Sequence, residues 1–243
     1  MNIIIPLGGK GERFQKEGYK EPKPLIKVFD KEMIFHVLDN LNIEKIDNIY
    51  IIYHHSLDEH NFCDIIHKKY PKITFIKLAE QTLGAAETIK IGLEYIMKIS
   101  EHKKCILLDC DTFYKSDILE KFRNIHDSNA VFYFKNYDVN PIFSYILLDD
   151  SSNKIIDVQE KIKISDNANV GVYCFRDADT LYEYCSYIIS NHIMFKNEYY
   201  TSCVISKMLD DGHHFIGIEL KEEDVVNLGT PKQMQDYISQ IMI

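Results

Sequence analysis

The sequence predicts an α/β fold with a mixed, mainly parallel β-sheet and helices on both of its faces. In the first half, four apolar segments rich in β-branched residues alternate with segments of helical periodicity. In the second half, apolar segments follow one another with only short connections. A glycine-rich turn comes directly after the first apolar segment, and open α/β sheets bind ligands beyond the carboxyl ends of their strands. We therefore expect a ligand site at that edge.

The first half of the chain has a β-α-β-α-β-α-β order. Strands are expected at residues 2–7, 48–53, 73–78 and 104–108, and helices at residues 31–42, 57–69 and 85–99. Ser56 and Glu59 form a capping box, which predicts the start of the helix over 57–69. Because the strands are separated by helices, this order predicts parallel pairing with helices covering both faces.

The second half has a different rhythm. Strands are expected at residues 129–135, 143–149, 153–159, 169–175, 214–219 and 224–227, and helices at residues 116–125, 178–190, 199–210 and 231–241. The polar run at 149–154 predicts a hairpin turn. We expect a single domain over residues 1–243, in which the later strands form a small lid subdomain over the first half.

Composition limits the partners of this protein. The chain has 243 residues and a net charge of -9, and it lacks the basic stripe that a nucleic-acid backbone requires. No segment approaches the thickness of a bilayer and no secretory leader is present, so we expect no membrane partner and a cytoplasmic location. The six cysteines and ten histidines show no zinc-binding spacing. Because the chain has no basic stripe, any phosphate binding must be local.

A glycine-rich, cationic turn follows the strand expected at residues 2–7. The run reads Leu7-Gly8-Gly9-Lys10-Gly11-Glu12-Arg13-Phe14, and Pro22-Lys23-Pro24-Leu25 comes shortly after it. Glycine has no Cβ, so backbone N–H groups in such a turn can approach an anion closely. Lys10, Arg13 and Lys23 add three cations, which offset much of the charge of a triphosphate. We expect residues 7–13 to contact a nucleoside triphosphate.

Two carboxylates follow the strand expected at residues 104–108. Asp109 and Asp111 alternate in direction at this strand end, where they can offer oxygen ligands to Mg²⁺. Such an ion neutralises charge while a phosphoryl or nucleotidyl bond breaks. The alternative is that both residues cap the next helix, but the strand-end position favours the metal.

Later segments can contact a ligand and also have ordinary structural explanations. Gln81, Gly84 and Ala85 begin a helix where a flat base can rest on the backbone, or where the helix packs tightly on the sheet. Lys161 can bind the phosphate of an acceptor, or it forms a solvated ion pair with Glu160.

The order and spacing of these segments resemble the nucleotidyltransferases typified by sugar-1-phosphate nucleotidylyltransferases. In that family, a G-G-x-G-x-R-[FL] loop and a downstream P-K-P-L bind the triphosphate, matching residues 8–14 and 22–25. The resemblance implies a Rossmann-like, GT-A-like nucleotidyltransferase fold with a nucleotide-binding half at 1–125 and an acceptor-binding half at 126–243.

The resemblance also implies a reaction and a role for each motif. An acceptor phosphate attacks the α-phosphorus of a nucleoside triphosphate and releases pyrophosphate, with Mg²⁺ as the cofactor. Arg13 holds the leaving pyrophosphate and Lys23 stabilises the α-phosphate, so both are expected to be catalytic. The base contacts Gln81, Gly84 and Ala85. The implied acceptor-binding residues are Glu160, Lys161, Asn169 and Gly171.

Two departures from the family bear on the metal and the acceptor. The second metal ligand is usually Asp, yet this chain has Asn227, so Asp109 is expected to compensate beside Asp111. Ser144 stands where sugar-nucleotide enzymes often have Gly, which favours a non-sugar acceptor. These features most resemble cytidylyltransferases that act on glutamine phosphate in bacterial capsule phosphoramidate synthesis. That resemblance implies CTP and L-glutamine phosphate as substrates and CDP-L-glutamine as the product.

Several alternatives stay open at this point. The acceptor can instead be phosphocholine, with CTP as the nucleotide, or a sugar 1-phosphate, with UTP, dTTP, GTP or CTP. A D-x-D glycosyltransferase is the main rival class, although it has no need of the cationic loop at 7–14. A non-catalytic nucleotide sensor is a third reading. The partners are expected to be small molecules, and a homodimer is one open option for the assembly.

Overall fold

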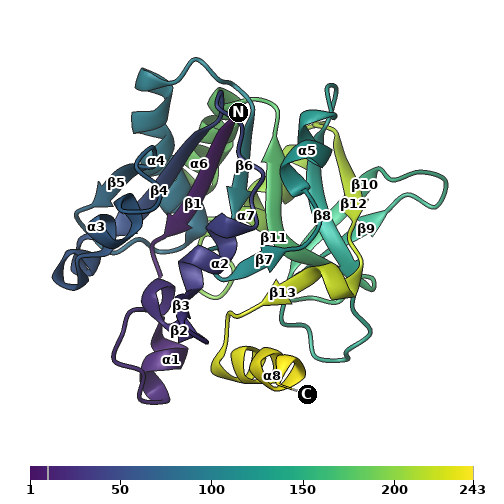
Figure 1. Cartoon of the computed structure of the whole chain (residues 1–243). Helices are drawn as coiled ribbons and strands as arrows, with labels where there is room; N and C mark the ends of the chain where they lie inside the picture. The colour runs from purple at the N-terminus through teal and green to yellow at the C-terminus, as the bar shows by residue number, and fades with distance from the viewer. Residues whose placement is uncertain (10, 243) are drawn as a thin grey trace.

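The computed structural model describes residues 1–9 and 11–242 and contains a mixed nine-stranded sheet. The main path of the sheet is β10-β9-β11-β6-β1-β4-β5, with β8 paired to β11 and β12 paired to β8 (Figure 1). Helices cover both faces, so the predicted fold class is confirmed. No helix among the described residues has the length and apolar character needed to cross a membrane.

The first half forms the parallel part of the sheet. Its strands are β1 (Asn2–Leu7), β4 (Asn48–His54), β5 (Thr74–Leu78) and β6 (Cys105–Leu108). β1 lies in the middle, in parallel pairing with β4 and β6. Ile3, Ile4 and Ile5 are fully buried because helices pack on both sides of this strand. The predicted strand positions are therefore confirmed here.

The second half adds strands to the same sheet in antiparallel pairing, except for β12, which pairs parallel with β8. They are β8 (Asn129–Lys135), β9 (Ser144–Leu148), β10 (Ile155–Glu160), β11 (Asn167–Phe175) and β12 (Phe215–Glu219). β11 pairs antiparallel with β6, β8 and β9, and its register with β8 shifts between Asn169 and Tyr173. The predicted 149–154 hairpin is present, with the Asp149 N–H donating to the Lys154 carbonyl at 2.8 Å.

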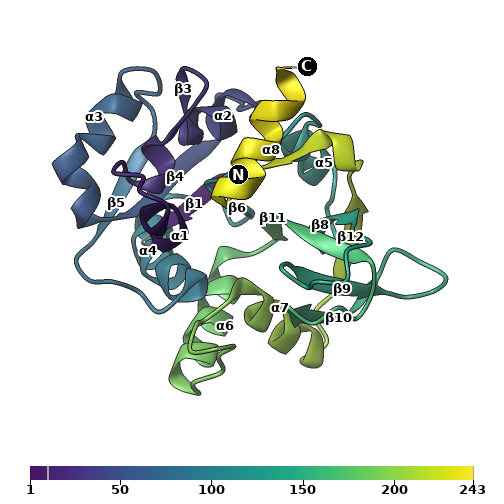
Figure 2. The ribbon, with the colours of Figure 1, turned by 90° about the horizontal axis from the view of Figure 1, so that it is seen from below.

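Six helices form the two layers that enclose the sheet. One layer holds α2 (Met33–Asp39), α3 (Phe62–His67) and α5 (Ile118–Arg123), and the other holds α4 (Ala85–Ile99), α6 (Ala178–Ser190) and α7 (Thr201–Asp210). Figure 2 shows the second layer against the sheet from below. Burial of apolar side chains from both layers supplies the main stabilisation of the fold.

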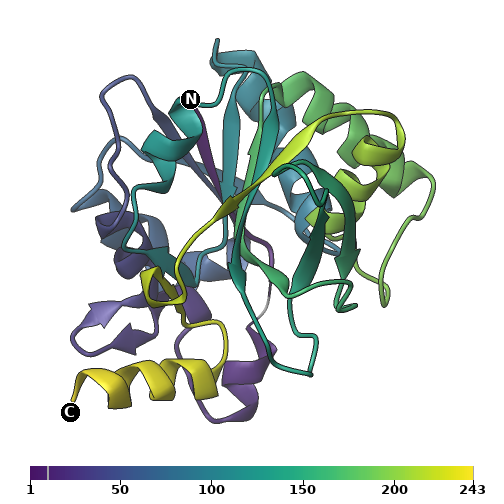
Figure 3. The same cartoon turned by 90° about the vertical axis from the view of Figure 1, so that its right-hand side faces the viewer.

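A third, smaller core lies below the carboxyl ends of the parallel strands. Its buried residues come mainly from α2 and from α1 (Glu12–Lys16), β2 (Lys27–Val28), β7 (Thr112–Tyr114), β13 (Val225–Asn227) and α8 (Pro231–Ile241). The short elements η1 (Lys23–Leu25), β3 (Lys31–Glu32) and η3 (Glu222–Asp224) adjoin them along the chain. Phe14 of α1, Phe113 of β7 and Met234 of α8 are buried together there. Figure 3 shows α8 running alongside α1. This core holds the glycine-rich loop against the last strand.

The predicted helix over 57–69 is wrong in its first part. A 3₁₀ helix, η2, spans His55–His60, the chain turns through a left-handed Asn61 at φ 52°, and α3 begins at Phe62. The His54 ring, rather than Ser56, caps η2 by accepting from the Ser56 N–H at 3.3 Å. The capping-box pattern failed because a neighbouring ring competes for the same backbone donor.

Candidate active site

The glycine-rich loop lies at the carboxyl end of β1. Leu7 is buried as the last residue of the strand, and Gly11 precedes α1 in a left-handed conformation at φ 67°. A Cβ on Gly11 would lie 3.1 Å from the Cβ of Lys23. Glycine at this position therefore brings the loop against the lysine of the P-K-P-L segment. Gly9 faces open space, and Lys10, predicted to bind nucleotide, lies outside the described residues.

A second segment supports the loop from behind. The Gln81 side-chain amide donates to the Gly8 carbonyl, and a Cβ on Gly8 would overlap the hydroxyls of Thr82 and Thr88. These two hydroxyls also bond each other at 2.6 Å. Gly8 is therefore required by packing, and Gln81 joins the loop to the segment predicted to bind the base.

The predicted base-binding glycine sits at a crossing of two chain segments. Gly84 has φ 139°, and a Cβ there would lie 2.5 Å from the Tyr199 carbonyl oxygen. The Tyr199 N–H donates to Leu83 at 2.8 Å, and the Ala86 N–H donates back to Tyr199 at 3.0 Å. Tight packing of this helix start is thus a structural fact, whereas nucleotide binding by Gly84 and Ala85 stays a prediction.

Lys23 and Asp111 form an ion pair at the centre of the site. The Lys23 ammonium donates to Asp111 Oδ2, and both side chains are only partly exposed. Burial by itself lowers the pKa of Lys23, but Asp111, together with Cys110 and Asp109, outweighs this effect and raises the pKa above its ordinary value. Lys23 therefore stays charged and lies between the phosphate loop and the predicted metal ligand.

Asp111 and Asn227 meet across the β7–β13 pair. Asn227 pairs with Thr112, and the Leu228 N–H donates to the Asp111 carbonyl at 2.7 Å. A Cβ on Gly229 would lie 2.8 Å from Asn227 Oδ1 and 2.9 Å from Asp111 Oδ2. Both oxygens therefore gather around one glycine. An oxygen pair of this kind suits Mg²⁺, which keeps water and substrate oxygens as its other ligands.

Asp109 faces a different neighbour from Asp111. Its carboxylate lies against Gly171, where a Cβ would overlap it, and its N–H donates to the Gly171 carbonyl at 3.0 Å. Part of the Asp109 residue is exposed to solvent, although protein atoms surround its carboxylate. Burial, followed by the Asp111 charge, raises the pKa of Asp109 to about 7. Asp109 is thus turned toward β11 and the acceptor half.

Glu160 and Lys161 end β10 beside α7. The Ser202 hydroxyl donates to Glu160 at 2.7 Å, and burial raises the pKa of this carboxyl. Lys161, held in a left-handed conformation at φ 51°, donates to the Tyr200 hydroxyl at 2.6 Å and lies 3.6 Å from Glu160. Glu160 and Lys161 are therefore part of a hydrogen-bond network with α7 and the residue before it, rather than the solvated ion pair that the sequence also allowed.

Asn169 and Gly171 shape the bulge of β11. Asn169 Oδ1 accepts the Gly171 N–H at 2.6 Å, while its Nδ2 has no partner among the described residues. Tyr173 lies further along the strand, where burial and the Asp109 and Glu160 carboxylates raise its pKa and the Ser144 hydroxyl opposes this rise. The bulge therefore brings polar groups from β9, β10 and β11 toward Asp109.

The structure brings most of the predicted residues to one place, but Arg13 and Glu12 are exposed. Arg13 is exposed at the start of α1, yet it is near enough to Tyr200 to oppose the rise in that hydroxyl's pKa. Glu12 points to solvent and lies 3.8 Å from Lys16. Sequence reasoning missed Tyr200 and Ser202, although the polar run before the α7 helix was a usable signal.

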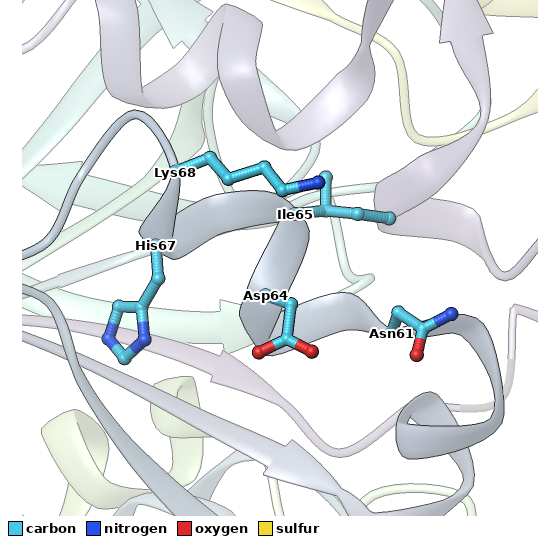
Figure 4. A pocket seen from close by; sticks show the side chains of 5 residues that line it. All are labelled: Asn61, Asp64, Ile65, His67 and Lys68. Atoms are coloured by element: carbon cyan, nitrogen blue, oxygen red, sulfur yellow. The ribbon is translucent and has the colours of Figure 1, made fainter.

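A hollow on α3 lies away from this site. A shallow hollow on α3 is lined by Asn61, Asp64, Ile65, His67 and Lys68 (Figure 4). The His67 ring there is bonded to the Ile73 carbonyl at 2.9 Å. No cluster of three or more His, Cys, Asp or Glu residues suited to a metal occurs within residues 1–9 and 11–242.

The fold and site define an α/β protein of the nucleotidyltransferase class, in which a cationic glycine loop meets a carboxylate at a strand end. The chain belongs to the nucleotidyl transferase family, whose model matches residues 2–239. It is 29% identical over 177 residues to the bifunctional protein GlmU of Methanocaldococcus jannaschii, covering 72% of this chain and 40% of that protein. It is 26% identical over 218 residues to GlmU of Clostridioides difficile, covering 86% of this chain and 44% of that one. The chain thus spans less than half the length of these relatives.

Solved structures share the whole fold. A nucleoside-diphosphate-sugar pyrophosphorylase from Vibrio cholerae aligns with a TM-score of 0.85 and 20% identity, covering 98% of this chain and 100% of that one. An inositol-1-phosphate CTP transferase from T. maritima aligns with a TM-score of 0.77 and 13% identity, covering 99% and 94%. At these identities the likeness establishes the fold.

Proposed function

We propose that this protein transfers a nucleotidyl group from a nucleoside triphosphate to the phosphate of a small metabolite and releases pyrophosphate. The observation that carries the proposal is the position of Lys23. Gly11 brings the phosphate loop against it, and Asp111 pairs with its ammonium. A cation held between a triphosphate loop and a metal-binding carboxylate is placed to act on the reacting phosphorus.

The proposed mechanism uses positioning and charge more than covalent chemistry. An oxygen of the acceptor phosphate forms a bond to the α-phosphorus, and the bond to the bridging oxygen breaks. The pyrophosphate leaves with that electron pair. Lys23 stabilises the charge on the α-phosphate, Arg13 at the mouth of the loop holds the pyrophosphate, and Lys161 orients the acceptor.

The residues around Gly229 fit a magnesium ion. Asp111 and Asn227 would hold it, because their side-chain oxygens converge and both are hard ligands. The ion, when bound, neutralises phosphate charge. Asp109 adds negative charge nearby but is turned toward Gly171, so its contribution to the metal is a separate proposal. An unchanged Mg²⁺ titration in Asp109→Asn would exclude that contribution.

We favour CTP and L-glutamine phosphate, giving CDP-L-glutamine for capsule polysaccharide modification. The shared fold of a CTP transferase supports the nucleotide, and the buried Ser144 supports a non-sugar acceptor. The second candidate is a sugar-1-phosphate nucleotidylyltransferase, which the shared fold of the Vibrio cholerae nucleoside-diphosphate-sugar pyrophosphorylase favours. A cytoplasmic location and small-molecule partners remain part of the proposal.

A pyrophosphate-release screen tests the proposal. Four nucleoside triphosphates are each combined with L-glutamine phosphate, phosphocholine and several sugar 1-phosphates. We expect release with CTP and L-glutamine phosphate. Release with UTP or dTTP and a sugar phosphate would overturn the substrate assignment while retaining the reaction. Sugar transfer from a nucleotide sugar without pyrophosphate would indicate the D-x-D glycosyltransferase class instead.

A further inference from the structure

The Asp109 carboxylate is exposed, and it has no hydrogen-bond or ion-pair partner among the residues that the structure describes. Among residues 1–9 and 11–242, no donor hydrogen-bonds it and no cation pairs with it. Lys23, the nearest described cation that affects its charge, is already paired with Asp111. An unpaired carboxylate in a protein-lined site is costly unless a ligand supplies the missing charge or donors.

The chain makes room for this carboxylate at the acceptor side. Gly171 has φ 80°, and any side chain there would overlap Asp109. The Glu160 carboxylate lies beyond it and is close enough to affect the charge of Asp109. Lys161 does not balance the pair, because its ammonium already bonds the Tyr200 hydroxyl and faces Glu160. Asp109 is therefore left without a balancing cation among the described residues.

An independent sign of a ligand lies in the same bulge. Asn169 is 3% exposed, its Oδ1 is used by the Gly171 N–H, and its Nδ2 has no partner among the described residues. Buried amide donors are nearly always bonded, so this one calls for an acceptor atom that the described protein does not supply. A ligand with both a cation and an oxygen would satisfy Asp109 and Asn169 together.

The unbalanced charge of the Asp109 carboxylate is unfavourable for an acceptor that carries only a phosphate. The incoming phosphate is an anion, and the Asp109 carboxylate lies next to the Lys23–Asp111 pair where it must react. A neutral sugar offers hydroxyl donors but no charge to offset this repulsion. A protonated primary amine offers both, and its hydrogens match a carboxylate better than a quaternary ammonium does.

We propose that Asp109 selects the acceptor by binding a primary ammonium group that accompanies the acceptor phosphate, with Asn169 Nδ2 donating to a neighbouring oxygen. This inference rests on the proposed function and deepens it, because it names the substrate class and the residue that discriminates it. Glu160 lines the far side of the same ammonium subsite. Asp109 acts by direct contact with the acceptor.

Binding measurements test this inference without requiring turnover. The probes are O-phosphoethanolamine and its N-acetyl derivative, titrated into the protein with Mg²⁺ and a CTP analogue whose α,β-bridge is methylene. We expect wild type to favour the free amine by about 10- to 100-fold, the range for a hydrogen bond to a charged group. In Asp109→Asn the preference falls to about threefold or less when Mg²⁺ and the nucleotide analogue are both saturating.

A second variant moves the carboxylate without removing it. Gly171→Ala places a Cβ where Asp109 Oδ2 now lies, so it reduces the amine preference although the charge is kept. Asp150→Asn, at an exposed position of the 149–154 hairpin, is the matched control and leaves the preference intact. Thermal unfolding of each variant shows whether it is folded at the temperature of the titration.

Three outcomes would overturn the inference. They are equal affinity for the two probes in wild type, no binding of the amine probe, and an equal loss for both probes in Asp109→Asn. If the amine preference is found but no triphosphate releases pyrophosphate with any acceptor, the proposed function fails alone. If pyrophosphate appears with sugar phosphates and the amine preference is absent, this inference fails alone.

Discussion

The two halves of the molecule contribute to the same site in different ways. In the first half, which we propose binds the nucleotide, glycines at βα turns present backbone, and single cations such as Lys23 supply the charge. In the acceptor half, side chains from several strands and a helix bond one another, as in the Ser202–Glu160 and Lys161–Tyr200 contacts. Backbone recognition suits an invariant triphosphate, whereas a side-chain network can be altered one residue at a time.

This contrast separates reaction type from substrate choice. If it holds, changes in the nucleotide half affect every acceptor equally, and changes in the acceptor half affect some acceptors and spare the nucleotide. The following variants examine that division, beginning with the largest expected effect.

Lys23→Ala is expected to lower turnover by about a thousandfold with every acceptor, because a preorganised charge at the reacting phosphorus is lost. Steady-state pyrophosphate release with each active acceptor provides the measurement. Lys20→Ala, an exposed lysine of the same loop, is the control and should change turnover little. A loss confined to one acceptor would break the comparison, and weaker nucleotide binding without any turnover in wild type would indicate a sensor.

Asn227→Ala is expected to raise the Mg²⁺ concentration for half-maximal turnover by about tenfold, because one of two converging oxygens is removed. Asn227→Asp should lower it by adding a charge. Mn²⁺ binding followed by electron paramagnetic resonance gives a readout that does not depend on turnover. Metal affinity that is identical in all three proteins would place the ion away from Gly229.

Lys161→Ala should raise the KM for the acceptor by about tenfold and leave the KM for the nucleotide unchanged, because a charge-assisted contact is lost on one side only. The control is Lys154→Ala in the exposed hairpin. Initial rates at varied acceptor and fixed nucleotide supply the comparison. Equal rises in both KM values would mean that the halves are not independent.

The smallest effect concerns pH and stability. Burial lowers the pKa of His36, which bonds the Val28 carbonyl at 3.1 Å and stacks on Phe113. Since the unfolded chain binds a proton here before the folded chain does, stability falls as pH drops below about 6.5 toward the folded pKa. We expect Tm to decrease by a few degrees at most and His36→Gln to flatten this slope. A slope unchanged by His36→Gln, but flattened by the exposed His126→Gln control, would contradict the assignment.

Much of the fold follows from local pattern. The segments at 2–7 and 85–99 coincide with β1 and α4, because apolar runs and helical periodicity determine such elements directly. The helix over 57–69 was misjudged because the His54 ring accepts the Ser56 N–H, the donor that Glu59 was expected to cap. The short β7 strand was not predicted, because three residues carry too little pattern and its partner β13 is distant in sequence.

The site was predictable where it depends on turns and less so where it depends on contacts. Lys23, Asp111 and Asn227 meet as their positions at strand ends and turns suggested. The packing of Gly84 on Tyr199 and of Asp109 on Gly171 joins residues far apart in the chain. No local spacing encodes such contacts, so the direction in which Asp109 faces required the structure.

The pairing of β7 with β13 has a consequence for biosynthesis. A nascent chain completes the glycine loop, Lys23 and Asp111 early, but Asn227 only after nearly all of the described chain has been made. Until β13 docks, Asp111 has Lys23 as its partner and lacks the oxygen that converges with it beside Gly229. Translation order thus delays the proposed metal-binding pair, Asp111 and Asn227, until the second half of the chain exists.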